Sequence, residues 1–157
     1  MSKLLCICGP NGAGKSTFSR TVAIRENLLV IDPDKLAAEG LSPLAAGKAA
    51  ARMARLFIQE GISFARESTL TAHFDLTLMQ EAKSHGYEVE LVYIRLASPE
   101  LALARIAARV ARGGHDVPEC DVRRRYTRSL ENLPKAMLLA DKVTILDNSS
   151  GNYIRCQ

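Results

Sequence analysis

The segment Gly9–Ser16 reads GPNGAGKS and fits G-x-x-x-x-G-K-[ST], the pattern of a phosphate-binding loop. An apolar run from Lys3 to Cys8 precedes the loop, and a helical pattern from Ser16 to Arg25 follows it. This motif requires strand, glycine-rich loop and helix in that order. The glycines let several backbone N–H groups point at one anion, and the helix N-terminus adds partial positive charge. The motif predicts a chain that binds a nucleoside triphosphate.

The individual positions of the loop have expected roles. Lys15 is expected to reach the β- and γ-phosphates, and the Ser16 hydroxyl is expected to ligate Mg²⁺. ATP and Mg²⁺ are therefore the expected cofactors. The predicted nucleotide-binding residues are Gly9, Pro10, Asn11, Gly12, Ala13, Gly14, Lys15, Ser16 and Thr17.

Length and composition favour one soluble globular unit. The chain has 157 residues, of which 47% are hydrophobic and 24% charged, so we expect residues 1–157 to form a single domain. No apolar run approaches the roughly 18 residues of a membrane span, and the first one is too short for a signal peptide. We expect a cytoplasmic protein that does not bind membranes. The cysteines lack zinc-site spacing and are expected to be free thiols: Cys6, Cys8, Cys120 and Cys156.

Strand and helix patterns alternate along the chain. Strands are expected at 3–8, 28–32, 62–66, 87–96 and 142–146, with an extended edge at 153–156. Helices are expected at 16–25, 43–59, 73–84 and 99–111, with a short one near residue 36 and a last one from residue 118. Pro134 is expected to kink or interrupt the last helix. The predicted class is α/β, a three-layer α/β/α P-loop kinase fold with a mostly parallel central sheet and a helical lid.

Two helices have expected apolar faces. In the helix at 43–59, the residues expected on one face are Met53, Leu56 and Phe57. In the last helix, the expected stripe consists of Val122, Tyr126, Leu130 and Leu133.

Seven arginines lie between Arg105 and Arg128 in a chain of net charge +4. Such a cluster is typical of a nucleic-acid surface, of a lid over phosphates, or of a solvated helix face. Tyr126 is the one aromatic residue in the run, which argues against nucleic acid as a partner. Arg105, Arg109 and Arg112 share a helix face, and two glycines follow them. A hinged arginine face fits a lid at roughly 105–128.

Acidic residues follow two of the expected strands. Asp32 and Asp34 come after the second strand, and Glu67 comes after the third. Ligands of open parallel sheets bind beyond the carboxyl ends of the strands, so these acids should face the phosphate loop. A kinase needs a carboxylate to accept a hydroxyl proton, and further acids to hold Mg²⁺ and its waters. A turn or a helix N-cap is the alternative role for either aspartate.

Several segments, in this order, resemble the zeta-toxin-like kinases: GPNGAGKST, IDPDK, RESTL, GYEVELVYIRL, SPELALARIAARVARGGHDVPE and RRRYTRSLENLP. The resemblance covers nearly the whole chain, and the IDPDK, ESTL and GGHDVPE elements are its most specific parts. It implies a P-loop kinase whose best-known relatives phosphorylate the amino-sugar hydroxyl of UDP-N-acetylglucosamine with ATP. The candidate partners are then a small-molecule phosphoryl acceptor and an antitoxin protein.

The resemblance also implies roles for single residues. Its catalytic residues fall on Asp34 as general base, on Lys15, and on Arg109 at the γ-phosphate. The residues expected on the substrate side are Asp32, Glu67, Thr69 and His115. His115 stands where the family has a second lid arginine, and one of Arg123 to Arg125 is the alternative for that role. Asn148 and Ser149 lie where such kinases hold adenine, but Asp147-Asn148 equally fits a plain turn.

The predicted function is an ATP-dependent kinase that transfers the γ-phosphate to a hydroxyl of a small molecule. One alternative is a P-loop NTPase switch or motor. No adjacent Asp-Glu pair ends an apolar strand, however, and no Asn-Lys-x-Asp motif is present. The other alternative is a nucleic-acid-associated ATPase or polynucleotide kinase that uses the arginine cluster. The sequence does not identify the acceptor, and a nucleotide sugar is the class that the resemblance favours.

Overall fold

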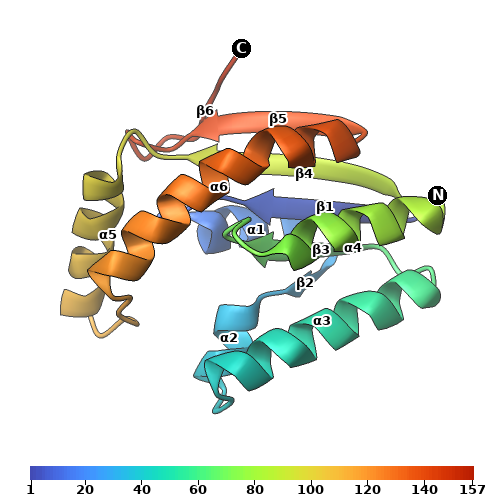
Figure 1. Cartoon of the computed structure of the whole chain (residues 1–157), viewed down its shortest axis with the longest axis horizontal. Coiled ribbons are helices and arrows are strands. Elements are labelled where there is room, and N and C mark those ends of the chain that lie inside the picture. Colours follow the sequence, from blue (N-terminus) through green and yellow to red (C-terminus); the bar gives the residue numbers. More distant parts are fainter.

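The computed structural model describes residues 1–157 and contains one six-stranded sheet (Figure 1). Its strands are β1 (Lys3–Cys8), β2 (Leu29–Ile31), β3 (Phe64–Ser68), β4 (Glu88–Arg95), β5 (Lys142–Asp147) and β6 (Ile154–Arg155), in the order β2-β3-β1-β4-β5-β6. The first five strands are parallel, and β6 pairs antiparallel with β5. The predicted α/β fold with a mostly parallel sheet is confirmed.

Six helices connect the strands: α1 (Lys15–Glu26), α2 (Pro33–Ala38), α3 (Pro43–Gln59), α4 (His73–Ser84), α5 (Pro99–Ala111) and α6 (Glu119–Leu139). The starts of α3 and α5 follow from local sequence. The side chains of Ser42 and Ser98 accept hydrogen bonds from backbone N–H groups in the first turn, and a proline follows each serine. None of the helices is both long and apolar enough to span a membrane.

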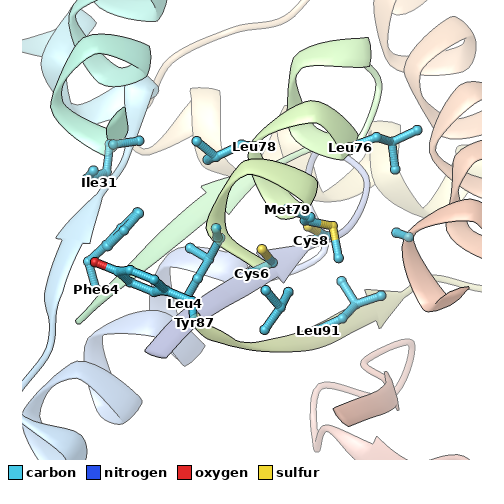
Figure 2. Close-up of a cluster of buried hydrophobic side chains, with 14 of the residues drawn as sticks. Leu4, Cys6, Cys8, Ile31, Phe64, Leu76, Leu78, Met79, Tyr87 and Leu91 are labelled. Carbon is cyan, nitrogen blue, oxygen red and sulfur yellow. The ribbon is translucent and has the colours of Figure 1, made fainter. Parts of the chain in front are cut away.

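The alternation of side chains along β1 divides the core into two layers. Leu4, Cys6 and Cys8 face a cluster formed with α3, α4 and the C-terminal part of α6 (Figure 2). Leu5 and Ile7 face the opposite cluster, formed mainly with α1 and α5. A central strand buried on both faces is typical of parallel sheets covered by helices. The four cysteines are free thiols, as predicted.

The face of α3 that packs on the core is not the predicted one. Met53 is 37% exposed and Leu56 is 52% exposed, whereas Phe57 packs at the edge of the core. The buried side chains recur every four residues instead: Ala46, Ala50, Ala54 and Ile58. The core-facing side of α3 therefore consists of three alanines and one isoleucine.

The bounds of β3 also differ from the prediction. The strand runs to Ser68, so Glu67 lies within it and not after it. Glu67 pairs in register with Ile7 of β1, and the Gly9 N–H donates to the Ser68 carbonyl at 3.2 Å. This pairing places the Glu67 carboxylate beside the start of the phosphate loop.

Helix α6 does not stop at Pro134, contrary to one of the predicted outcomes. Pro134 is exposed, so its ring lies on the solvent side of the helix. The predicted stripe is also partly wrong. Val122 is buried, but Leu130 is 44% exposed, and Ser129 and Ala136 are buried in its place. Residues 105–128, the expected lid, comprise the end of α5, the loop after it and the start of α6.

Candidate active site

A cavity of about 310 Å³ opens at the carboxyl ends of the parallel strands. The phosphate loop forms one wall, and α5 forms another. The cavity contains three side-chain groups that the sequence singled out from distant segments, namely the loop lysine, two acids and two arginines of α5. The lining residues are Asn11, Gly12, Gly14, Lys15, Ser16, Thr17, Asp34, Glu67, Arg105, Ile106 and Arg109.

The phosphate loop is folded tightly around the Lys15 side chain. Its ammonium donates to the carbonyls of Gly9 at 2.8 Å and Pro10 at 3.0 Å. Burial lowers the pKa of Lys15, while the nearby Glu67 and Asp34 carboxylates oppose that shift. Gly9 has φ +154°, and a Cβ there would overlap the Ile94 carbonyl oxygen. Only glycine fits at this position, where the loop leaves β1.

Glu67 is bonded to the first turn of α1. It is 5% exposed and accepts hydrogen bonds from Ser16 Oγ at 3.0 Å and from Ser19 Oγ. Burial raises the pKa of Glu67, although both serine hydroxyls favour its ionised form. A serine hydroxyl and a carboxylate are hard oxygen ligands of the kind that Mg²⁺ takes. The Ser16–Glu67 pair therefore fits a magnesium ion, and it places Glu67 beside the predicted metal ligand.

The two aspartates after β2 have different environments. Asp32 is the N-cap of α2, and its Oδ1 accepts from the Asp34 N–H at 3.0 Å. Burial and the Asp34 charge raise the pKa of Asp32. Asp34 lines the cavity, whereas Asp32 does not. The N-cap alternative therefore describes Asp32, and Asp34 is the acid that faces the phosphate loop.

The arginines of α5 also differ. Arg105 lines the cavity and donates to the carbonyls of Gly12 at 3.4 Å, Asn148 at 2.5 Å and Ser149 at 3.1 Å. Arg109 lines the cavity too, and its Nε and Nη2 donate to the His115 carbonyl at 3.1 and 2.8 Å. Arg112 donates to the Ala108 carbonyl of its own helix and lies outside the cavity.

Other predicted residues are not part of the cavity wall. His115 contributes its backbone carbonyl to Arg109, and its side chain is exposed. The Thr69 hydroxyl lies 2.9 Å from that of Thr71. Two candidates for the second lid arginine are paired with acids at the surface: Arg123 with Glu100 and Glu119, and Arg124 with Asp121.

Two residues that the sequence analysis did not assign to the phosphate loop donate hydrogen bonds to its backbone carbonyls. Asn148 Nδ2 donates to the Ala13 carbonyl at 2.8 Å, and the Tyr153 hydroxyl donates to the Gly14 carbonyl at 2.7 Å. The position of Asn148 after the last core strand had suggested an adenine site or a turn. Tyr153 carries no sequence signal beyond being an aromatic residue near the last strand.

The glycine-rich loop at the edge of a mostly parallel sheet, with acids and arginines around one cavity, defines a nucleotide-binding protein with a P-loop kinase-like fold. Residues 4–133 match the family described as AAA domain, and the chain belongs to this family. An uncharacterized protein of Haemophilus influenzae is 37% identical over 131 residues, which are 80% of this chain and 93% of that protein.

Solved structures show the same fold at low sequence identity. A structure of the PezAT chromosomal toxin-antitoxin system of Streptococcus pneumoniae has a TM-score of 0.75 and 17% identity, over 100% of this chain and 71% of that one. A sugar kinase from Janibacter sp. HTCC2649 has a TM-score of 0.58 and 17% identity, over 94% of this chain and 86% of that one. The predicted resemblance to the zeta-toxin-like P-loop kinases is confirmed.

Proposed function

We propose that the protein is an ATP-dependent kinase that transfers the γ-phosphate to a hydroxyl group of a small molecule. The observation that carries this proposal is the cavity in which Lys15, Asp34 and Arg109 line the same space. Phosphoryl transfer depends mainly on positioning and on stabilising spread negative charge, so a cation, a proton acceptor and an arginine around one cavity suit it.

Each of the three residues has a proposed role. Lys15 holds the β- and γ-phosphate oxygens. The Asp34 carboxylate accepts the proton of the acceptor hydroxyl as its oxygen bonds to the γ-phosphorus and the bond to ADP breaks. Arg109 stabilises the charge on the transferring phosphoryl group, and its bond to the His115 carbonyl keeps the guanidinium at the cavity.

Ser16 and Glu67 are the proposed magnesium residues. A bound Mg²⁺ neutralises charge on the β- and γ-phosphates. The hydrogen bond between Ser16 Oγ and the Glu67 carboxylate supports placing Glu67 on the metal side of the cavity, not against the acceptor. The sequence resemblance had favoured the acceptor side for Glu67.

The acceptor class that we favour is a nucleotide sugar, with UDP-N-acetylglucosamine as the first candidate. The zeta-toxin-like segments support this choice, and the similar fold of a sugar kinase supports a sugar hydroxyl more generally. The likeness to a structure from a toxin-antitoxin system supports a search for a protein partner. The ion pairs of Arg123 and Arg124 leave less free positive charge for nucleic acid.

The experiment is a transfer screen with γ-labelled ATP and Mg²⁺ over nucleotide sugars, nucleosides, free sugars and hydroxylated antibiotics. We expect labelled product with one class, and none with the Lys15→Ala variant purified in parallel. ATP hydrolysis without acceptor is measured in the same assay. Hydrolysis as fast as any transfer would favour an NTPase switch, and the absence of both activities would refute the proposal.

A further inference from the structure

Three consecutive carbonyls of the phosphate loop are bonded to side chains from the C-terminal third of the chain. The Gly12 carbonyl accepts from Arg105 at 3.4 Å, the Ala13 carbonyl from Asn148 at 2.8 Å, and the Gly14 carbonyl from Tyr153 at 2.7 Å. Asn148 and Tyr153 belong to the turn between β5 and β6, and neither lines the cavity.

These bonds determine the direction of the neighbouring N–H groups. In a planar trans peptide, the carbonyl of one residue and the N–H of the next point in opposite directions. Asn148 and Tyr153 hold the carbonyls of Ala13 and Gly14, and they therefore orient the N–H groups of Gly14 and Lys15. The Ala13 N–H is already used within the loop, where it donates to the Pro10 carbonyl at 3.1 Å.

The contact between the turn and the loop is close. A Cβ on Gly14 would lie 2.6 Å from Asn148 Nδ2 and 2.7 Å from the Tyr153 hydroxyl oxygen. The turn is also held as a unit, because the Tyr153 N–H donates to Asn148 Oδ1 at 3.3 Å. Tyr153 has φ +47°, a conformation that residues with side chains rarely adopt, and its ring lies 5.6 Å from that of Phe18. These contacts fix the position of the Tyr153 side chain against the phosphate loop.

We propose that Asn148 and Tyr153 are positioning residues that orient the phosphate loop for nucleotide binding. The inference rests on the proposed function and extends it to the β5–β6 turn. Asn148 is 5% exposed, and both polar atoms of its amide are bonded within the protein. It therefore acts on the phosphates through the loop and does not read the nucleobase.

The test compares Tyr153→Phe and Asn148→Ala with wild type. Tyr153→Phe removes one hydroxyl and keeps the ring, and the Gly14 carbonyl retains its bond from the Phe18 N–H at 3.2 Å. Tyr87→Phe is the matched control, since the Tyr87 hydroxyl also donates to backbone carbonyls, those of Phe57 and Ile62, at the opposite end of the sheet. Binding of Mg-ATP and of Mg-tripolyphosphate is measured by calorimetry, together with kcat, KM and the melting temperature.

We expect each of the two turn variants to bind ATP and tripolyphosphate about three- to tenfold more weakly, because each loses one hydrogen bond to a carbonyl of the loop. KM for ATP should rise by the same factor while kcat changes little, and Tyr87→Phe should leave both affinities unchanged. Wild-type affinity for both ligands in Tyr153→Phe would overturn the inference. Weaker ATP binding with unchanged tripolyphosphate binding would overturn it too, because Asn148 would then read the base. A wild-type protein that binds neither ligand would refute the proposed function itself.

Discussion

The Glu67 carboxylate is almost fully buried, and this makes the stability of the nucleotide-free protein depend on pH. Burial raises the pKa of Glu67 above the ordinary value of 4.5. Between that value and the raised one, the folded state binds more protons than the unfolded state. The free energy of unfolding therefore falls as pH rises through this window. Above this window, the folded state carries the full cost of ionising the buried carboxylate.

Glu67→Gln should remove this cost, because glutamine stays neutral and can still bond to both serines, accepting at its Oε1 and donating from its Nε2. We expect the variant to have a higher melting temperature than wild type at pH 7 without nucleotide, and the difference to shrink as pH falls toward 4.5. Transfer activity should fall at the same time, since a proposed magnesium ligand is lost. Melting curves over pH check the first part. A destabilised variant at pH 7 would contradict the assigned effect of burial.

Asp34 and Asp32 offer a direct comparison of two neighbouring acids. Asp34→Asn keeps the shape of the side chain and removes the proton acceptor, so we expect turnover to fall about 10²–10⁴-fold with ATP affinity within a few-fold of wild type. Asp32→Asn should have a small effect, because asparagine is also a good N-cap for α2. Steady-state kinetics on both variants measure this. A larger loss of turnover in Asp32→Asn would show that the choice between the two acids is wrong.

The part of the cavity that could be predicted from sequence is the part carried by local motifs. The phosphate loop is contiguous, Asp34 follows β2, Glu67 lies next to the last residue of β3, and the family resemblance pointed to Arg109. Asn148 and Tyr153 could not be found in this way, since their bonds to the loop span 135 and 139 residues. Such contacts depend on how β5 and β6 are placed beside the loop, and no local pattern records that.

Arg105 and Arg109 of α5 line the cavity, whereas Arg112, the C-cap of this helix, does not. Arg109→Lys keeps the charge but loses the planar group that can hold two phosphate oxygens, so we expect kcat to fall about tenfold or more with ATP binding only mildly weakened. Arg112→Lys is the matched control at the C-cap of the same helix, because Arg112 lies outside the cavity. Kinetic constants for both variants are the measurement. Equal, small effects would remove Arg109 from the active site.

The structure gives Arg105 contacts that the sequence analysis did not predict. Helix spacing grouped Arg105 with Arg109 and Arg112, and the family resemblance favoured Arg109 over the other two. The Arg105 guanidinium instead bonds to three carbonyls in the phosphate loop and the β5–β6 turn. A lysine cannot reproduce that geometry, so Arg105→Lys should weaken nucleotide binding as well.

In helix α6, packing against the core outweighs the usual effect of a proline inside a helix. A proline inside a helix removes one backbone hydrogen bond and clashes with the preceding turn, yet α6 continues through Pro134. Buried Ser129 and Ala136 lie on either side of Pro134 along the helix, and they keep α6 against the core. The prediction for α3 also differs from the structure. A stripe of alanines faces the core, and the larger side chains of Met53 and Leu56 lie toward solvent.

Pro134→Ala should therefore stabilise the protein. The new N–H can bond to the Leu130 carbonyl, and Pro134 is exposed, so no core contact is lost. We expect a gain of about 1–3 kcal/mol in the free energy of unfolding, up to the full difference between proline and alanine in a helix interior. Urea unfolding at constant pH measures it. A loss of stability would mean that proline relieves a strain in α6 that alanine cannot.

The two core layers meet at the sheet, and the phosphate loop follows β1 in the middle of that sheet. Nucleotide binding should therefore raise the free energy of unfolding of the whole domain. A ligand that binds only the folded state raises the free energy of unfolding by about 2.7 kcal/mol at a hundred times its Kd. For a domain of this size, that corresponds to a rise in melting temperature of about 5–10 °C.

Lys15→Ala should lose most of the rise, because it removes the cation on the β- and γ-phosphates. It should also remain folded without nucleotide, since Lys15 is a buried charge whose pKa burial lowers. Thermal scans of both proteins with increasing Mg-ATP make the measurement. An equal rise in the variant would place the nucleotide away from the phosphate loop, and the kinase assignment would fail with it.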